Sequence, residues 1–539
     1  MNKHIPRSSH LTPEFSERRR NILKHGALAV SALAFPWLRS RDARSQTQAT
    51  FDYYISPTGN DSNPGTQAAP WAITSLSPNT QNSSNVANWN KIAGKRIGLL
   101  SGTYNVFALW QSASYNVPAL DIPGGTAGAN TVIQSVTPQG AHITANNNGS
   151  LPGSSGSSVS IIGQGYKHAT GYVTFDGLVI SDSNGYGIWV QGNDIGGQEG
   201  GGGPFVIQNC EIYNIGGDEG NNPACIMQYN STGNLIQNCK LHDCTASSGG
   251  SNGHNFAGIF SFNCHANTYQ YNTIYNCNSG IYDKNSANGG HTYYANYIEV
   301  NGSSPFACVT DSAGGKAGDV RNVHHNVFVI ASGTGNNNIY LGLVGAASNG
   351  DPQESLLFYN NTCYALSGGG WQGGLVWQSQ GNAMSPAASV KQYNNIYSSG
   401  APGEFGDVLF NPTTNGVSLS DYNCYTNATG SSAVLGMNST AGDASLYSLA
   451  TWRSNFALDT HSITGSPAFT NAGVALTPSG YTLGSGSACN GAGRVGGTSS
   501  GAACNMGAWD GTTNQIGCNF SSSTTSAPAV PDAPALTVS

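Results

Sequence analysis

A short strand pattern with an asparagine near its end returns along the middle of the chain. If Asp176 is taken as the first copy, successive copies are separated by 33, 29, 34, 24, 30, 35, 34 and 28 residues. This scattered period is typical of a β-solenoid whose loops vary in length, whereas a propeller blade needs about 40 residues or more. We therefore predict an all-β fold, a single right-handed parallel β-helix. The marked positions are Asp176, Asn209, Asn238, Asn272, Asn296, Asn326, Asn361, Asn395 and Asn423.

The recurring asparagines are expected to have a structural role. Parallel coils stack at about 4.8 Å, so an amide at the same place in each coil can donate to one neighbour and accept from the other. Such a ladder keeps every buried amide paired.

A second strand follows each asparagine strand, and its alternation predicts inward and outward columns. Isoleucines fill the inward column. Large apolar rings fill the outward column, where they could floor a groove for an extended polysaccharide; alternatively, loops bury this row as a second core. The inward column is Ile188, Ile226, Ile259 and Ile281, and the outward row is Trp189, Met227, Phe260, Tyr282, Val309, Tyr340 and Trp377.

A second outward column lies two residues further along these strands and ends in charged residues. We expect its rings, together with His254 in a glycine-rich loop, to add to the substrate-binding surface. The column holds Gln191, Tyr229, Phe262, Lys284 and Asp311.

The first 45 residues are predicted to be an export signal. Arg18, Arg19 and Arg20 precede a short apolar stretch, a pattern that resembles a twin-arginine signal with cleavage after Ser45. The stretch is shorter than the roughly 20 residues that span a bilayer. We therefore expect a periplasmic or extracellular protein, not a membrane protein.

Removal of the signal makes the chain strongly acidic. It leaves 11 of the 20 basic and 24 of the 27 acidic residues, a net charge of −13. This balance argues against a nucleic-acid partner, whose phosphates need basic patches, and against an anionic substrate unless metal ions intervene. We expect a monomer that binds a polysaccharide.

The remaining organisation follows from composition. We expect an N-terminal cap with the first coils over residues 51–130, the β-helix over 131–430, a C-terminal cap over 431–515 and a disordered tail over 516–539. Twelve cysteines in an exported protein permit disulfides. Cys489 and Cys504 are a plausible local bridge, and Cys210 and Cys239 form either an apolar stack or a bond.

From about Phe51 to Asp510 the chain resembles the pectate-lyase-like right-handed β-helix superfamily of exported bacterial proteins. The resemblance rests on the opening segment from Tyr53 to Thr66 and on closing motifs such as residues 459–463 and 506–509. It implies the fold and a polysaccharide-active protein. It does not define one activity, because one fold hosts many chemistries.

The resemblance also bears on Lys284. Its placement is similar to that of the catalytic lysine of some β-helix polysaccharide lyases, although the arginine that those enzymes carry about one coil later is missing from residues 306–312. In a lyase, Lys284 would remove the proton alpha to a uronate carboxyl group. Asp283 and Asp311 could hold a Ca²⁺ ion that bridges to the substrate.

Three alternatives stay open. Lys284 and Asp311 could form a structural ion pair between coils. Asp283 and Asp311 could be the carboxyl pair of a glycoside hydrolase if they lie roughly 5–9 Å apart, but Asp283 belongs to the alternate column of its strand, which is expected to face inward. A surface protein that binds glycans without cleaving them is the non-enzymatic alternative.

His324 and His325 are expected to be structural, one facing the core and one facing solvent.

Overall fold

The computed structural model describes residues 50–78, 83–111, 118–146, 160–165, 170–192, 203–216, 222–245, 256–284, 290–300, 306–309, 319–330, 337–340, 355–366, 371–376, 389–399, 408–409, 417–427, 433–438, 444–513 and 515–520. From Phe51 onward these residues belong to one compact unit. The predicted signal segment therefore lies outside the described residues. No helix in the described part is long and apolar enough to cross a membrane.

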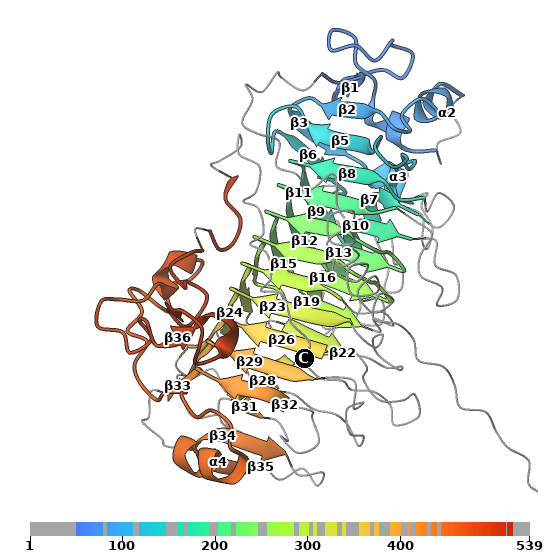
Figure 1. Ribbon diagram of the computed structural model, residues 1–539. Coiled ribbons are helices and arrows are strands. Elements are labelled where there is room, and N and C mark those ends of the chain that lie inside the picture. The colour runs from blue at the N-terminus through green and yellow to red at the C-terminus, as the bar shows by residue number, and fades with distance from the viewer. Residues whose placement is uncertain are drawn as a thin grey trace, which may run out of the picture. The chain divides into compact units, whose positions relative to one another are not determined.

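Three long sheets of parallel strands run along this unit, and the chain visits sheets A, B and C in turn in each coil (Figure 1). The predicted parallel β-helix is confirmed. Sheet A contains β1 (Tyr53–Ile55), β2 (Arg96–Leu99), β5 (Thr131–Ser135), β8 (Val173–Asp176), β11 (Phe205–Gln208), β14 (Leu235–Gln237), β17 (Thr268–Gln270), β20 (Thr292–Tyr294), β23 (Val320–His324), β26 (Ser355–Tyr359), β29 (Val390–Tyr393) and β32 (Val417–Asp421).

Sheet B follows sheet A across a short turn. It contains β3 (Gly102–Asn105), β6 (Ala141–Thr144), β9 (Val179–Ser183), β12 (Glu211–Ile215), β15 (Lys240–Cys244), β18 (Thr273–Tyr275), β21 (Tyr297–Val300), β24 (Val327–Ile330), β27 (Thr362–Ala365), β30 (Ile396–Ser399) and β33 (Cys424–Asn427).

Sheet C completes each coil and ends in one antiparallel pair, β34 with β35. It contains β4 (Leu120–Asp121), β7 (Ser160–Gln164), β10 (Tyr186–Gln191), β13 (Ala224–Tyr229), β16 (Ala257–Phe262), β19 (Ser279–Lys284), β22 (Phe306–Val309), β25 (Asn337–Tyr340), β28 (Trp371–Val376), β31 (Val408–Leu409), β34 (Ala433–Asn438) and β35 (Ala444–Ser448).

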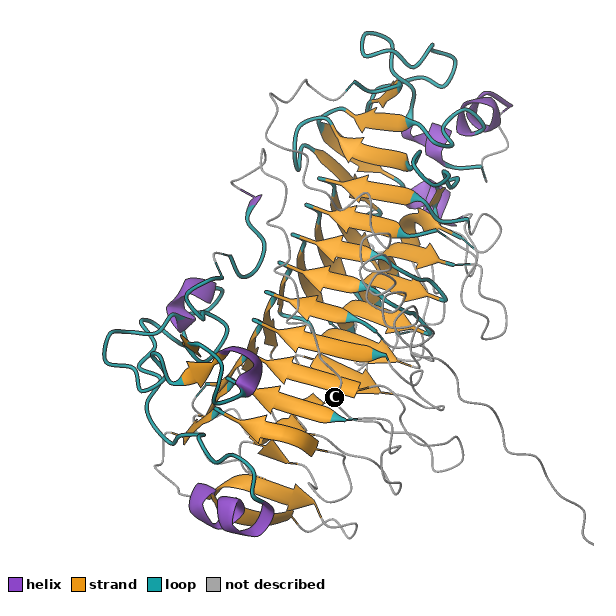
Figure 2. Cartoon of the chain, viewed as in Figure 1, coloured by secondary structure: helices purple, strands orange, loops and turns teal. Residues whose placement is uncertain are grey.

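The short helices lie outside the stack of strands (Figure 2). One of them, α4, packs its fully buried Trp452 against the interior core and so closes the last coil. They are η1 (Ile73–Leu76), α2 (Ser83–Trp89), α3 (Phe107–Gln111), α4 (Leu449–Phe456), η4 (Pro478–Tyr481) and η5 (Val495–Gly497); β36 (Gly493–Arg494) and β37 (Ala503–Cys504) form a small hairpin.

The predicted inward isoleucines of sheet C are fully buried in one continuous core. Ile188, Ile226, Ile259 and Ile281 pair in register from coil to coil. Each buried side chain of this size stabilises the fold by roughly 1.5–3 kcal/mol relative to an exposed one, so the column helps to keep successive coils in register.

The predicted asparagine ladder is present at the turn from sheet A to sheet B. The Asn326 amide nitrogen donates to Asn361 Oδ1 at 3.0 Å, and Asn326 Oδ1 accepts from the Asn296 amide at 2.9 Å. The ladder runs through Asn272, Asn296, Asn326, Asn361, Asn395 and Asn423, all fully buried.

The first three predicted positions, Asp176, Asn209 and Asn238, do not belong to this inner ladder. Cys210 and Cys239 occupy its column, and Asn209 and Asn238 stand one residue earlier, at positive φ. Asn238 donates to Asn209, which donates to Asp176, so these residues form a separate outer ladder. A left-handed turn position favours asparagine over other side chains, which explains why the sequence repeats it there.

The chain beyond α4 does not remain beside the last coil of the β-helix. Residues 458–513 and 515–520, the C-terminal segment, run back along the A–B turns toward earlier coils. Its successive contacts are Arg494 with Asn394, Asn505 with Asn360, Asp510 with His325, Gly517 with Ala295, Cys518 with Thr273 and Asn519 with Asn238.

No disulfide joins any of the described cysteines, including both expected pairs. Cys489 is buried in an apolar cluster, while the Cys504 sulfur lies 3.5 Å from the Asn394 amide nitrogen. The bridge expected between Cys489 and Cys504 is therefore absent. Cys210 and Cys239 form a buried stack of thiols rather than a bond.

Candidate functional site

The outward columns of sheet C follow the predicted register only as far as β19. Trp189, Met227, Phe260 and Tyr282 pair in succession. The residue opposite Tyr282 is Ala307, and Val309 stands opposite Lys284. Val309 therefore does not belong to the ring row, and Asp311 lies two residues past the position opposite Lys284.

Tyr340 and Trp377 were both predicted for the ring row, but they do not stand opposite each other. Tyr340 pairs with Ala307 and so keeps its predicted place in the row. The residue opposite Tyr340 is Val376, so the row does not pass through Trp377 as predicted. The register of β25 with β28 shifts twice between Asn337 and Ile339.

The row of rings does not form an open groove. Trp189, Phe260 and Tyr282 have 4%, 0% and 7% of their surface exposed, and they pack with Met227 in a second apolar cluster. The prediction of an exposed groove along these residues is wrong, and the alternative of a second core is correct. Burying such large apolar rings away from water stabilises the fold more than leaving them exposed would.

Two rings of the neighbouring column are only half-buried. Tyr229 and Phe262 stack with their ring centroids 5.2 Å apart and their planes 10° apart, and they pack against the edge of the buried cluster. Phe262 pairs in register with Lys284. These rings therefore lie beside the position of the predicted catalytic lysine.

The side chains of Lys284, His254, Asp311 and Trp377 lie outside the described part of the chain. For Lys284 only the backbone is described, at the end of β19 between Phe262 and Val309. His254, Asp311 and Trp377 are not described at all.

Asp283 points into the interior of the β-helix, as its alternate column requires. Its carboxylate is fully buried, accepts a hydrogen bond of 2.7 Å from the Tyr293 hydroxyl, and lies 3.4 Å from Arg321 Nη2 and 3.5 Å from His291 Nε2. A carboxylate in this position cannot act on a glycan outside the coil. It is also unsuitable as a surface Ca²⁺ ligand, since Arg321 already supplies a positive charge.

A cluster of buried polar side chains, not predicted from the sequence, reaches this carboxylate through His291. Asn234, Asn267 and His291 stand in one inward column of sheet A and form a second ladder, in which the Asn234 backbone donates to Asn267 Oδ1 and the Asn267 backbone donates to His291 Nδ1. From sheet C, Gln228 and Ser261 meet the hydroxyl of Tyr269. The signal in the sequence is the polar residue just before β14, β17 and β20.

His291 gives the fold a dependence on pH. Burial lowers the pKa of His291 to about 4, against the opposing effect of the Asp283 carboxylate. Between pH 6.5 and 4 the unfolded chain binds a proton that the folded chain does not, so stability falls as pH falls, by at most about 1.4 kcal/mol per pH unit. We expect urea unfolding midpoints to drop between pH 7 and 5, and the drop to be smaller in His291→Asn. An equal drop in both proteins would contradict this assignment.

An ion pair lies at the surface near the buried polar cluster around Asp283. His265 Nε2 lies 3.6 Å from Asp319 Oδ2, and each side chain is 22% exposed. The pair joins the turn after β16 to the residue before β23. We refer to this region, with the ends of β16, β19 and β22, as the C–A corner.

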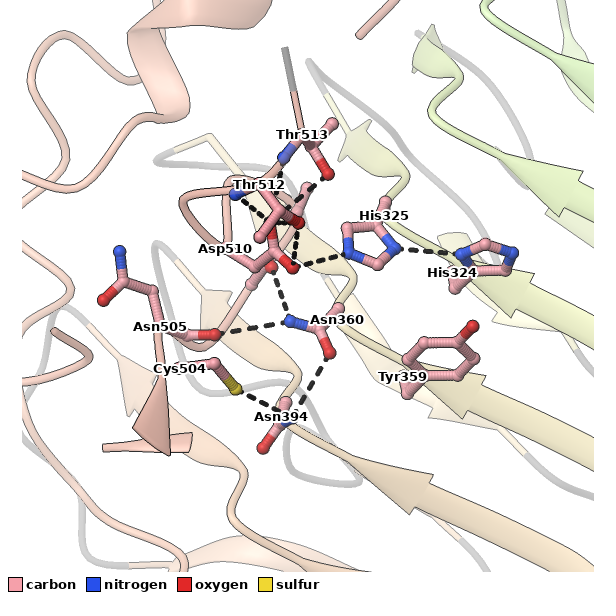
Figure 3. A network of polar contacts seen from close by, with 12 residues as sticks. His324, His325, Tyr359, Asn360, Asn394, Cys504, Asn505, Asp510, Thr512 and Thr513 are labelled. Atoms are coloured by element: carbon pink, nitrogen blue, oxygen red, sulfur yellow. Dashed lines mark hydrogen bonds and ion pairs between the residues drawn. The ribbon is translucent and has the colours of Figure 1, made fainter. Parts of the chain in front are cut away.

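His324 and His325 do not divide between core and solvent as predicted. Both are buried beside the C-terminal segment, and their Nδ1 atoms are 2.9 Å apart (Figure 3). Burial lowers the pKa of His324. Burial alone would raise the pKa of Asp510, but the hydrogen bond and charge interaction with His325 and the hydrogen bonds from Thr512 together outweigh that effect and hold the pKa well below its usual range. The network fastens the C-terminal segment to the coil, so its role is structural.

No group of three or more histidine, cysteine, aspartate or glutamate side chains in the described part is placed to hold a metal ion. No family model matches the chain, and no curated protein matches it. Similar solved structures include a pectate lyase, with 15% identity over 85% of this chain and 96% of the other and a TM-score of 0.41. A rhamnogalacturonan lyase shows 13% identity over 80% and 94% of the two chains, with a TM-score of 0.33.

A lacto-N-biosidase from Eubacterium ramulus is also similar, with 13% identity over 72% of this chain and 65% of the other and a TM-score of 0.34. The likeness is slight. At these values it does not carry an activity, a substrate or site residues over to this chain.

Proposed function

We propose that this chain is an exported polysaccharide-processing enzyme that cleaves a uronate-containing glycan by β-elimination at the C–A corner. One observation carries the proposal: the half-buried rings of Tyr229 and Phe262 continue in register to Lys284. Apolar ring surface beside a potential base is what a sugar-cleaving site requires, because sugars present C–H groups to rings and the reaction needs a proton acceptor.

The interior supports the position of the base. Asp283, the residue before Lys284, is fixed inside the coil by Tyr293, His291 and Arg321. Fixing the backbone of a strand end keeps a reacting group within the narrow range of positions that catalysis needs. The buried Asp283 also removes the Asp283–Asp311 pair that a hydrolase would use.

In the proposed reaction, Lys284 takes the proton alpha to the uronate carboxyl group, and the electron pair of the resulting enolate forms a carbon–carbon double bond. The C–O bond at the beta carbon breaks, and the glycosidic oxygen leaves and takes up a proton to become a hydroxyl. The substrate carboxylate has to be neutralised while this charge develops. A Ca²⁺ ion held with the help of Asp311 would supply that charge. It would also offset the repulsion between an acidic chain and an anionic glycan.

Product chemistry tests the proposal. We expect the protein without its signal to release products with strong ultraviolet absorbance, the mark of unsaturated uronates, from at least one polyuronate in a panel that also contains neutral glycans. Turnover should fall on chelation and return with added Ca²⁺.

Two results would count against this reaction. Reducing ends that form without ultraviolet absorbance would indicate hydrolysis. Binding of a glycan without cleavage of any panel member, with and without Ca²⁺, would indicate the non-enzymatic glycan-binding protein.

A further inference from the structure

Sheet B carries a second row of rings on its outward face, away from the C–A corner. Tyr213 on β12, His242 on β15 and Tyr275 on β18 pair in register. His142 on β6 adds a fourth ring beyond β9, whose Ser181 stands opposite Tyr213. Ring centroids are 6.2, 5.0 and 4.6 Å apart in succession, and the last two pairs of planes lie within 8° of parallel. We call these four residues the sheet B row. Since ring faces cover one another along the axis of the helix, the outer edges of the rings face away from the coil.

Polar side chains line both sides of the sheet B row. On one side Lys240 Nζ donates to Glu211 Oε1 at 2.8 Å, and Glu211 Oε1 also lies 3.3 Å from His242 Nε2. On the other side His242 Nδ1 lies 2.7 Å from Asp243 Oδ2. The His242 ring is thus held between two carboxylates.

The side of the sheet B row that contains Asp243 is a column of residues whose backbone is in the left-handed conformation. Asp182, Asn214, Asp243 and Asn276 all have positive φ, a conformation that asparagine and aspartate tolerate better than most residues. Asn214 donates to Asp182, and Asn276 donates to Asp243. The amide and carboxylate groups therefore repeat with the coils.

The charges on this face exclude some ligands and some chemistry. The hydrogen bond from His242, the largest cause, lowers the pKa of Glu211 to about 2, so Glu211 is ionised at neutral pH and cannot be a general acid. Lys240 is paired with Glu211, and His242 contacts both Glu211 and Asp243, so these basic side chains already meet carboxylates. A polyuronate would find little positive charge to pair with here.

The C-terminal segment covers part of sheet B, but it leaves the surroundings of the sheet B row partly exposed. The C-terminal segment packs on later coils, where Tyr481 meets Tyr297 and the Leu476 amide donates to Glu299. Its contacts reach Thr273 and Asn238 at the edge of the sheet B row. Beside the row, the Lys240, Glu211 and Asp243 side chains keep 34%, 23% and 43% of their surface exposed, and His242 within the row keeps 11%.

We propose that the sheet B row is a non-catalytic binding face for a neutral, hydroxyl-rich polysaccharide laid along the axis of the helix. Tyrosine edges and fixed amide and carboxylate groups pair with sugar hydroxyls. Stacked rings lose little rotamer freedom on binding, which lowers the cost of association. The repeat of the coils matches a ligand that also repeats along one direction.

Affinity electrophoresis in gels containing a neutral β-glucan, a neutral β-mannan or polygalacturonate tests this proposal. We expect retardation by at least one neutral glycan and none by polygalacturonate through this face. Tyr213→Ala/Tyr275→Ala should weaken neutral binding on the order of tenfold, a loss of about 1.4 kcal/mol. Tyr54→Ala, which alters a half-buried ring on sheet A, is the matched control and should not change it.

A second variant guards against misfolding. Tyr213→Phe/Tyr275→Phe keeps the stack and removes only the hydroxyls, and it should also weaken binding while the circular dichroism spectrum stays unchanged. Binding to no neutral glycan, or equal binding by all these variants, would overturn the proposal. Lys284→Ala should retain neutral binding, so this face and the proposed cleavage site can fail independently.

Discussion

Arg321→Ala is expected to lower the free energy of unfolding by about 3–5 kcal/mol, because it leaves a buried carboxylate without its cation. Asp283 and Arg321 are both inside the coil, with 0% and 2% of their surface exposed. His291 does not replace the lost charge, since burial lowers its pKa to about 4 and keeps it neutral near pH 7. Urea unfolding at pH 7 followed by circular dichroism measures the change.

Two comparisons sharpen this test. Asp283→Asn/Arg321→Met removes both charges and should recover most of the lost stability. Arg96→Ala removes a half-buried arginine that bonds to Gln134 on sheet A, and it should cost less than about 1 kcal/mol. If Arg321→Ala is as stable as Arg96→Ala, the interior ion pair is not a main support of the coil.

Lys284→Ala is expected to reduce β-elimination by about 10²–10⁴-fold, the usual contribution of a general base. Lys284→Arg should be equally inactive: it keeps the positive charge but arginine stays protonated and cannot accept the proton. Initial rates of ultraviolet absorbance on the preferred polyuronate measure both variants.

Lys391→Ala is the control for this experiment. Lys391 lies on β29 of sheet A, away from the C–A corner, and its loss should leave the rate unchanged. An active Lys284→Ala would remove Lys284 as the base. An active Lys284→Arg with an inactive Lys284→Ala would mean that this position supplies charge and not proton transfer.

The local repeat carried most of the information about the fold. The asparagine pattern predicted the parallel coils and most of the inner ladder, because a buried amide must be paired and the next coil offers the partner. The inward isoleucines of sheet C were predicted for a similar reason, since alternation is fixed by strand geometry. The start of the inner ladder at Asn272, one coil after Cys239, was not predicted. Asparagine occurs both at the left-handed turn position and at the ladder position, so the repeat alone does not tell the two apart.

The site was less predictable, because it depends on segments between the strands. β22 comes one coil after Lys284, beyond β20 and β21, and its register differs by two residues from the predicted one, which places Val309 where Asp311 was expected. Whether rings such as Phe260 face solvent depends on what packs over them, which alternation does not reveal. The Asp283–Arg321 pair joins residues 38 positions apart on different sheets, and no local pattern indicates such a contact.

The mass balance of the reaction tests the central claim most directly. A defined oligouronate is incubated with the protein, and the two products of a single cleavage are weighed by mass spectrometry. β-Elimination adds no water, so we expect the product masses to sum to the mass of the substrate, with the new non-reducing end unsaturated. A sum larger by one water would show hydrolysis and contradict the proposed reaction.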